Sequence, residues 1–154
     1  MNKSMHLSEH FTLGEVTKTS VKTADGNIPS HVAIENLKNL CENWLEDLRY
    51  SHNTLYGEKD EPIIITSGYR SAEVNKAVGG SPTSNHLTGC AVDIRCAGIE
   101  QALRYANILL DIADGTKRDY DELFIERSKQ GRYWIHFAVR PKGNRRKTEF
   151  IFIR

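Results

Sequence analysis

Residues 84–96 constrain the fold of this 154-residue chain more than any other stretch of its sequence. A polar loop containing His86 ends at Gly89, and the residues that follow alternate with a period of two. One face carries Cys90, Val92, Ile94 and Cys96, and the other carries Ala91, Asp93 and Arg95. This alternation is typical of a strand in a sheet that has one face on the core and the other open to polar groups.

Apolar spacing predicts the remaining elements. Apolar residues at steps of three and four predict helices over residues 30–50 and 99–113, and a brief helix over 71–78 fits between a capping Ser71 and Gly79. The expected strands are residues 63–66, 91–95, 123–127, 133–139 and 149–153, and the third and fourth of them form a hairpin. Residues 7–28 look like an irregular arm with a short helix near 13–17. We therefore expect one α+β domain over residues 1–154, with a mostly antiparallel sheet and flanking helices.

Composition excludes several classes of protein. Lys and Arg number 21 and Asp and Glu number 20, so the net charge of +1 argues against a nucleic-acid partner. The longest apolar runs, such as residues 63–65, are far shorter than the ~20 residues that a membrane span needs. The start of the chain lacks the apolar core of a signal peptide, so we expect synthesis in the cytoplasm.

Three cysteines, Cys41, Cys90 and Cys96, give an odd count without CxxC spacing. This pattern favours free, buried thiols over a disulfide framework or a thiolate zinc finger.

A metal site is the strongest chemical signal. His86, Asp93 and His136 offer two imidazoles and one carboxylate, the three protein ligands of a catalytic zinc ion whose fourth position stays open. A site from His86, Cys90 and Cys96 is also conceivable, but the strand alternation puts both thiols on the face opposite Asp93. The four remaining histidines lack such a context and are interpreted as surface residues: His6, His10, His31 and His52.

The string SGYRSAEVNKAVGGSPTSNHLTGCAVDI, together with the later WIH, resembles the M15 zinc peptidases, which include D-Ala-D-Ala carboxypeptidases and phage endolysins that act on cell-wall peptides. The opening LSEHFTLGEVTKTS is similar to a phage-associated branch, so the resemblance covers nearly the whole chain. It implies a Hedgehog/DD-peptidase-like fold with Zn²⁺ held by His86, Asp93 and His136.

The general base does not follow from the resemblance, because several M15 members place a Glu three residues before the last His and this chain has Tyr133 there. Glu126 and His136 are equidistant from Gly131. A hairpin symmetric about Gly131 sets the two side chains directly opposite each other on one face. This register predicts Glu126 as the base; the alternative is an exposed carboxylate.

Three further residues are candidates for substrate contact. Arg70 has a planar fork suited to a carboxylate, and it is also a candidate ion-pair partner. The resemblance implies that it contacts a substrate carboxylate or polarises the scissile carbonyl. Ser84 is a candidate substrate-contacting hydroxyl or a residue that orders its loop through a hydrogen bond. Trp134 either forms a wall of the expected substrate cleft or packs against neighbouring side chains. The basic stretch 140–147 fits a solvated turn better than a site for anionic wall polymers.

The sequence thus predicts a zinc-dependent peptidase of peptidoglycan stem peptides, a D,D-carboxypeptidase or an endopeptidase that reaches the wall after phage-type release or other delivery. One alternative is a non-catalytic, zinc-containing module that binds cell wall or protein. A weaker alternative is a metal-free structural protein of a phage particle.

Overall fold

The structure is a computed structural model that describes residues 1–153. It has a five-stranded sheet in the order β1-β2-β4-β3-β5. Its strands are β1 (Ile65–Ser67), β2 (Ala91–Cys96), β3 (Glu122–Arg127), β4 (Tyr133–Ala138) and β5 (Lys147–Phe152). All neighbouring strands are antiparallel except β3 and β5, which run parallel. The expected α+β class with a mostly antiparallel sheet is confirmed.

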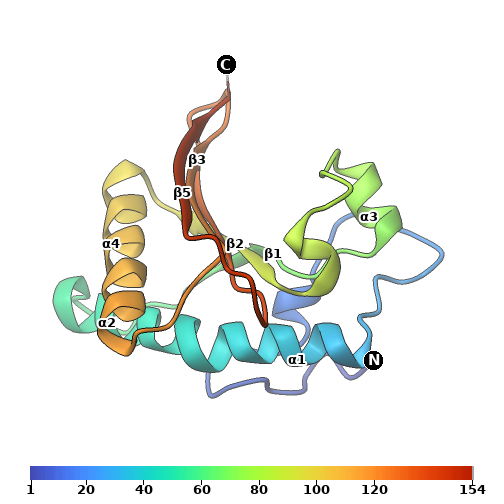
Figure 1. Cartoon of the computed structure of the whole chain (residues 1–154), viewed down its shortest axis with the longest axis horizontal. Coiled ribbons are helices and arrows are strands. Elements are labelled where there is room, and N and C mark those ends of the chain that lie inside the picture. The colour runs from blue at the N-terminus through green and yellow to red at the C-terminus, as the bar shows by residue number, and fades with distance from the viewer. Residues whose placement is uncertain (154) are drawn as a thin grey trace.

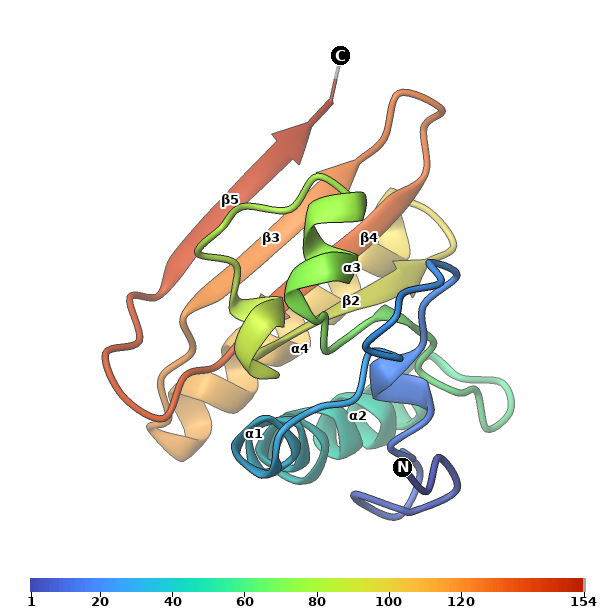
Figure 2. The same cartoon turned by 90° about the vertical axis from the view of Figure 1, so that its right-hand side faces the viewer.

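Four α-helices accompany the sheet: α1 (His31–Leu40), α2 (Glu46–Tyr56), α3 (Ala72–Ala77) and α4 (Ile99–Thr116). A π-helical segment, Cys41–Leu45, joins α1 to α2, and short 3-10 helices lie at Glu15–Thr17 and Asn85–Thr88. Figure 1 shows the sheet close to edge-on, with α4 on one side and α3 on the other. In Figure 2, α3 lies in front of the sheet and α4 behind it. Among residues 1–153, no helix is long and apolar enough to cross a membrane.

The hydrophobic core fills the space between the α4 side of the sheet and the helices α1, α2 and α4. Val92 and Ile94 of β2 and Ile135 and Phe137 of β4 are fully buried there. The ring of Phe137 packs against that of Trp44, with the ring centroids 5.0 Å apart. Because strand side chains alternate, the polar residues of the same strands lie on the opposite face, which is the face covered by α3.

The predicted helix over residues 30–50 is too short, because the helical segment continues to Tyr56. Residues 51–56 are mostly polar and carry no apolar repeat. His52 lies in this extension, and the prediction that it is a surface residue is wrong. It is buried against Tyr105 of α4, with the ring centroids 4.9 Å apart. Burial lowers the pKa of His52, which favours the neutral ring.

The cysteine prediction is confirmed. Cys41, Cys90 and Cys96 are free and buried. Burial raises the pKa of Cys41 and Cys96 to about 12, so both stay protonated at neutral pH. Cys96 belongs to the core cluster on the α4 side of the sheet, away from Asp93, which removes the alternative site built on His86 and two thiols.

Candidate metal centre

Two strands and one 3-10 helix bring three potential ligands together on the face of the sheet that α3 covers. Asp93 of β2 and His136 of β4 are directly paired across the antiparallel ladder. His86 comes from the 3-10 helix Asn85–Thr88, which precedes β2. One ligand atom from each residue lies within 4.8 Å of the other two. The sequence predicted this convergence.

Local capping fixes the position of His86. The Ser84 hydroxyl accepts a hydrogen bond from the backbone N–H of His86 at 3.2 Å and so caps the 3-10 helix. Gly89 ends the helix in the left-handed region, at φ 73°. A Cβ atom at Gly89 would also clash with the carbonyl oxygen of Ala33 in α1. The turn from His86 into β2 therefore requires glycine.

Each histidine ring is held from the side that faces away from Asp93. Nδ1 of His86 lies 2.7 Å from the carbonyl oxygen of Gly68, and its Nε2 lies 3.3 Å from Oδ1 of Asp93. His136 has the reverse orientation, with Nε2 3.0 Å from Oε1 of Glu122 and Nδ1 3.0 Å from Oδ1 of Asp93. One nitrogen of each ring is thus tied to an acceptor and the other points into the cluster, as is usual for histidine ligands of a metal.

Burial and charge act against each other in this cluster. Burial disfavours the ionised form of Asp93, but contacts with His86 and His136 outweigh burial and hold its pKa below the usual range. Burial likewise disfavours a charged His136, yet its hydrogen bonds to Asp93 and Glu122 raise its pKa to about 9. Asp93 is therefore a carboxylate at neutral pH, the form in which it can hold a cation.

Arg70 contacts this cluster directly. Its Nη2 lies 3.3 Å from Oδ2 of Asp93, its Nε donates to the Ser67 hydroxyl at 3.0 Å, and its Nη1 donates to Asn75 at 3.4 Å. The guanidinium is thus held against the aspartate oxygen that does not contact the histidines. It lines the same cavity as His86.

The predicted register of the β3–β4 hairpin is wrong by two residues. Phe124, and not Glu126, is paired with His136, and Glu126 is paired with Trp134. A shift of two preserves the face, so Glu126 still lines the cavity that contains His136. Its Oε2 accepts a hydrogen bond from Nε1 of Trp134 at 2.7 Å. Burial and the charge of Asp93 raise the pKa of Glu126.

Tyr133 faces the other way. It lies an odd number of residues from His136 on β4 and packs against the core cluster. A carboxylate three residues before the last histidine would point away from the cluster here, so a side chain at position 133 cannot serve as the general base.

Sequence reasoning missed Glu122. Besides its contact with His136, its Oε1 accepts a hydrogen bond from Nδ2 of Asn85 at 2.6 Å. Asn85 also donates to Oδ2 of the fully buried Asp121 at 2.8 Å. The alternation of β3 was a usable signal, because it puts Glu122 on the same face as Glu126.

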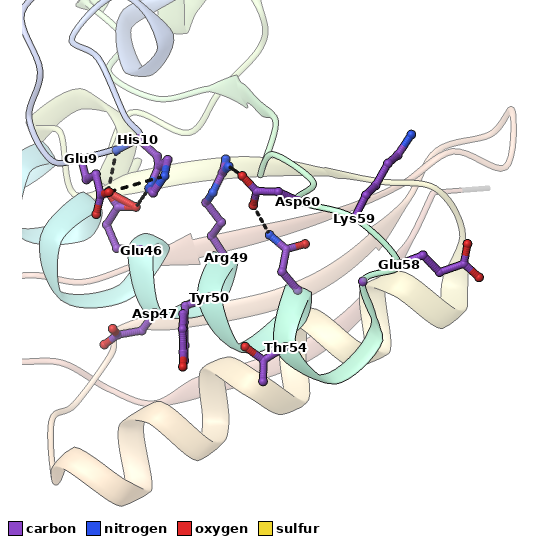
Figure 3. Close-up of a pocket in the computed structure, with 12 residues that line it drawn as sticks. Glu9, His10, Glu46, Asp47, Arg49, Tyr50, Thr54, Glu58, Lys59 and Asp60 are labelled. Atoms are coloured by element: carbon purple, nitrogen blue, oxygen red, sulfur yellow. Dashed lines mark hydrogen bonds and ion pairs between the residues drawn. The ribbon is translucent and has the colours of Figure 1, made fainter.

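The cluster opens into a cavity of about 480 Å³ between the sheet and the segment around residues 80–86. Arg70, Ser84, Glu126 and Trp134, all candidates from the sequence, line it together with the three potential ligands. A different cavity, of about 590 Å³, lies beside α2 and is shown in Figure 3. Some of its charged groups pair with each other, as in the contacts of His10 with Glu46 and of Arg49 with Asp60. Among residues 1–153, His86, Asp93 and His136 are the group suited to holding a metal.

A comparison with protein families finds a match to the family described as Peptidase M15 over residues 9–118. The match covers more than half of the chain, and the chain therefore belongs to this peptidase family. Family membership implies hydrolase activity on a peptide substrate. His86 and Asp93 lie within the matched residues, whereas Glu126 and His136 follow them. A comparison with curated proteins gives no match.

Proposed function

We propose that this protein is a zinc-dependent metallopeptidase that hydrolyses peptide bonds in the stem peptides of peptidoglycan. We further propose that residues 1–154 form one domain of the Hedgehog/DD-peptidase type. The observation that carries the proposal is the convergence of two imidazoles and one carboxylate, with no fourth protein ligand among residues 1–153, in a cavity that also holds the half-buried Glu126.

The residues present fit zinc. Nε2 of His86, a carboxylate oxygen of Asp93 and Nδ1 of His136 form the donor set, and Gly68 and Glu122 hold the two rings in the tautomers that free these nitrogens. Zinc, when bound, supplies Lewis-acid chemistry, which polarises the carbonyl group and makes water more acidic.

Glu126 is the proposed general base and acid. Water attacks the carbonyl carbon of the scissile bond, its proton passes to the Glu126 carboxylate, and that proton is then delivered to the nitrogen of the leaving amine. A raised pKa suits this double role, because the Glu126 carboxylate then accepts a proton more readily than an ordinary glutamate and can still pass it on. The hydrogen bond from Trp134 fixes one carboxylate oxygen and leaves the other for the proton.

Arg70 orients Asp93 through its Nη2, and in this proposal its remaining N–H groups stabilise the developing oxyanion. Trp134 forms a wall of the cleft. Ser84 orders the loop that carries His86, and its hydroxyl faces the same cavity, where a substrate amide is its natural partner.

The peptidoglycan substrate is inferred from the resemblance of the S-x-H-x-x-G-x-A-x-D element, here residues 84–93, to enzymes of cell-wall peptides. Action at the wall after phage-type release or other delivery belongs to the same inference.

Digestion of purified muropeptides tests the proposal. Wild-type protein with added zinc is expected to release peptide products that mass spectrometry identifies, and the identified bond distinguishes carboxypeptidase from endopeptidase activity. His86→Ala and Glu126→Gln are the matched variants, and both are expected to be inactive. Product from none of the muropeptides, with zinc bound at full stoichiometry, would instead favour a non-catalytic binding module.

A further inference from the structure

We propose that Arg140 and Arg145 form a subsite for a carboxylate group of the substrate, at the end of the cleft formed by the loop between β4 and β5. This inference rests on the proposed peptidase function and names a chemical feature that the substrate must carry. Both arginines line the same cavity as His86, Asp93 and His136.

Buried Asp121 anchors the two guanidinium groups. Arg145 makes a two-pronged contact with it, with Nε 3.0 Å from Oδ1 and Nη2 2.8 Å from Oδ2. Arg140 approaches from the other side, with Nε 3.2 Å from Oδ2 of Asp121 and 2.9 Å from Oδ1 of Asn85. Asp121 has no exposed side-chain surface, so it cannot take part in recognition itself. It holds the two arginines in fixed positions.

Several donors remain unused on the cleft side. Within residues 1–153, neither Nη1 nor Nη2 of Arg140 makes a hydrogen bond, and Nη1 of Arg145 makes none. The two side chains are 36% and 49% exposed, so these groups are open to a ligand. A planar fork with free N–H groups matches the two oxygens of a carboxylate.

Arg70 offers a contrast. Each of its three nitrogens already donates to Ser67, Asn75 or Asp93. A substrate carboxylate therefore finds more open donors at Arg140 and Arg145 than at the arginine beside the metal ligands.

The subsite is linked to the cluster by a short chain of contacts. Nη2 of Arg145 lies 3.4 Å from Oε2 of Glu122, and Oε1 of Glu122 lies 3.0 Å from Nε2 of His136. The separation suits a substrate in which the carboxylate lies close to the scissile bond in the chain. Lys147, which pairs with Glu149, also lines this cavity and is a third cationic group there.

Two substrate groups present this chemistry. One is the free C-terminal carboxylate of a peptide, which would make the enzyme a carboxypeptidase. The other is an internal carboxylate, such as that of the D-Glu residue of a stem peptide. Amidation of one group at a time distinguishes them, because an amide keeps the shape and removes the charge.

The experiment compares three synthetic stem pentapeptides: one with all its carboxylates free, one amidated at the C-terminus and one amidated at D-Glu. Their kcat/KM values are measured for zinc-loaded wild-type protein, Arg145→Gln and Arg140→Gln. Arg146→Gln is the matched control, because Arg146 is the next residue along but pairs with Asp114 and Asp119 outside the cleft. Thermal unfolding verifies that each variant is folded, and Arg140→Gln carries the test if Arg145→Gln is not.

We expect one of the two amidations to lower the wild-type kcat/KM by roughly ten- to hundredfold, the typical effect of losing a charged hydrogen bond. The same amidation should have little effect on the Arg145 and Arg140 variants, whereas Arg146→Gln should discriminate like wild type. Two results would overturn the subsite: a wild-type enzyme indifferent to both amidations, or Arg140 and Arg145 variants that still prefer the free acid.

If wild-type protein cleaves no peptide, the proposed function fails, and the subsite is tested by binding alone. The probe is then the dipeptide D-Ala-D-Ala, as free acid and as amide, titrated into zinc-loaded protein and followed by NMR. Tighter binding of the acid that is lost in Arg145→Gln supports the subsite, and equal binding of acid and amide contradicts it.

Discussion

Gly68 and Glu122 decide which nitrogen of each histidine faces Asp93. The carbonyl oxygen of Gly68 accepts a hydrogen bond from Nδ1 of His86, and the carboxylate of Glu122 accepts one from Nε2 of His136. Such partners orient a metal ligand and make it a better electron donor. We therefore expect the metal affinity of the candidate site to depend on two residues that are not themselves candidate ligands.

Replacement of Glu122 tests this dependence. Glu122→Ala should weaken zinc binding by about 10- to 100-fold, because His136 loses the acceptor that fixes its ring. Competition with a chromophoric chelator measures the affinity. Glu149→Ala on the neighbouring strand β5 is the control and should bind zinc like wild type. Equal zinc affinity of the two variants would contradict the orienting role of Glu122.

The raised pKa of Glu126 predicts how the activity depends on pH. Because burial raises its pKa, the base is ionised only above a pH higher than that of an ordinary glutamate. The value of kcat/KM should therefore fall as the pH falls through this raised pKa. Glu126→Gln should lose activity by about 10²- to 10⁴-fold and still bind zinc. A fully active Glu126→Gln would assign the proton transfer to another group.

The convergence of His86, Asp93 and His136 was predictable from the sequence, whereas the contact of Glu122 and the register of the β3–β4 hairpin were not. Gly131 has φ 80° and donates from its N–H to the carbonyl oxygen of Ser128, so it closes a turn and does not stand at its centre. Glycine takes this left-handed position after a type I turn in many hairpins. The symmetry axis consequently lies one residue earlier, at residue 130, and every pair shifts by two.

At the scale of elements, the tight passage from the 3-10 helix into β2 sets the distance between His86 and Asp93. Gly89 and Gly79 both have φ 73°, but a Cβ atom would clash with Ala33 at the first and meet nothing at the second. Gly79→Ala should cost about 1–2 kcal/mol of unfolding free energy from backbone strain alone. Gly89→Ala should cost about 3–5 kcal/mol, because α1 and the loop must also move apart.

Urea unfolding of the two variants measures these costs. Zinc affinity is the second measurement, and it should drop in Gly89→Ala only. Similar losses of stability and unchanged zinc binding in both would show that the close approach to α1 does not position His86.

Several elements were predictable because their signals are local. The periodicity of α4, the Ser71 cap of α3 and the alternation of β2 are each set by residues a few positions apart in the sequence. The end of α2 and the pairing of β5 depend on distant partners. His52 is buried because α4 packs over it, and β5 lies parallel to β3 because the connection after β4 crosses to the outer edge. Neither partner is visible in the local sequence.

On the scale of the whole molecule, the two faces of the sheet have separate tasks. The face toward α4 forms the core, and the face toward α3 carries the candidate metal centre. Figures 1 and 2 show these two helices on opposite sides of the sheet. Asp121 stands at the edge of both, fully buried and bonded to Arg145, Arg140 and Asn85. This carboxylate ties Arg140 and Arg145 of the loop between β4 and β5 to the start of β3.

Asp121 should therefore contribute strongly to global stability. Although burial opposes its ionisation, hydrogen bonds from Arg145 and Asn85 outweigh burial and lower the pKa of Asp121 to about 2. A lowered pKa means that the stabilisation is complete above the unfolded value near 3.8 and is lost as the pH falls toward 2.

Asp121→Ala should lower the unfolding free energy by about 3–5 kcal/mol at neutral pH, as expected when a buried ion pair loses one partner. Asp119→Ala removes an exposed partner of Arg146 and should cost less than about 1 kcal/mol. Urea titrations at neutral pH and near pH 2 make the comparison, and the difference between wild type and Asp121→Ala should shrink at the lower pH. A constant difference would contradict the role of the ionised carboxylate.

The central claim is that His86, Asp93 and His136 hold one zinc ion with a coordination position left open. Anomalous diffraction from crystals grown with zinc, recorded on both sides of the zinc absorption edge, tests it most directly. We predict one strong peak about 2.0–2.2 Å from Nε2 of His86, a carboxylate oxygen of Asp93 and Nδ1 of His136, with no fourth protein ligand. A peak elsewhere, or one closed by a fourth side chain, would contradict the account.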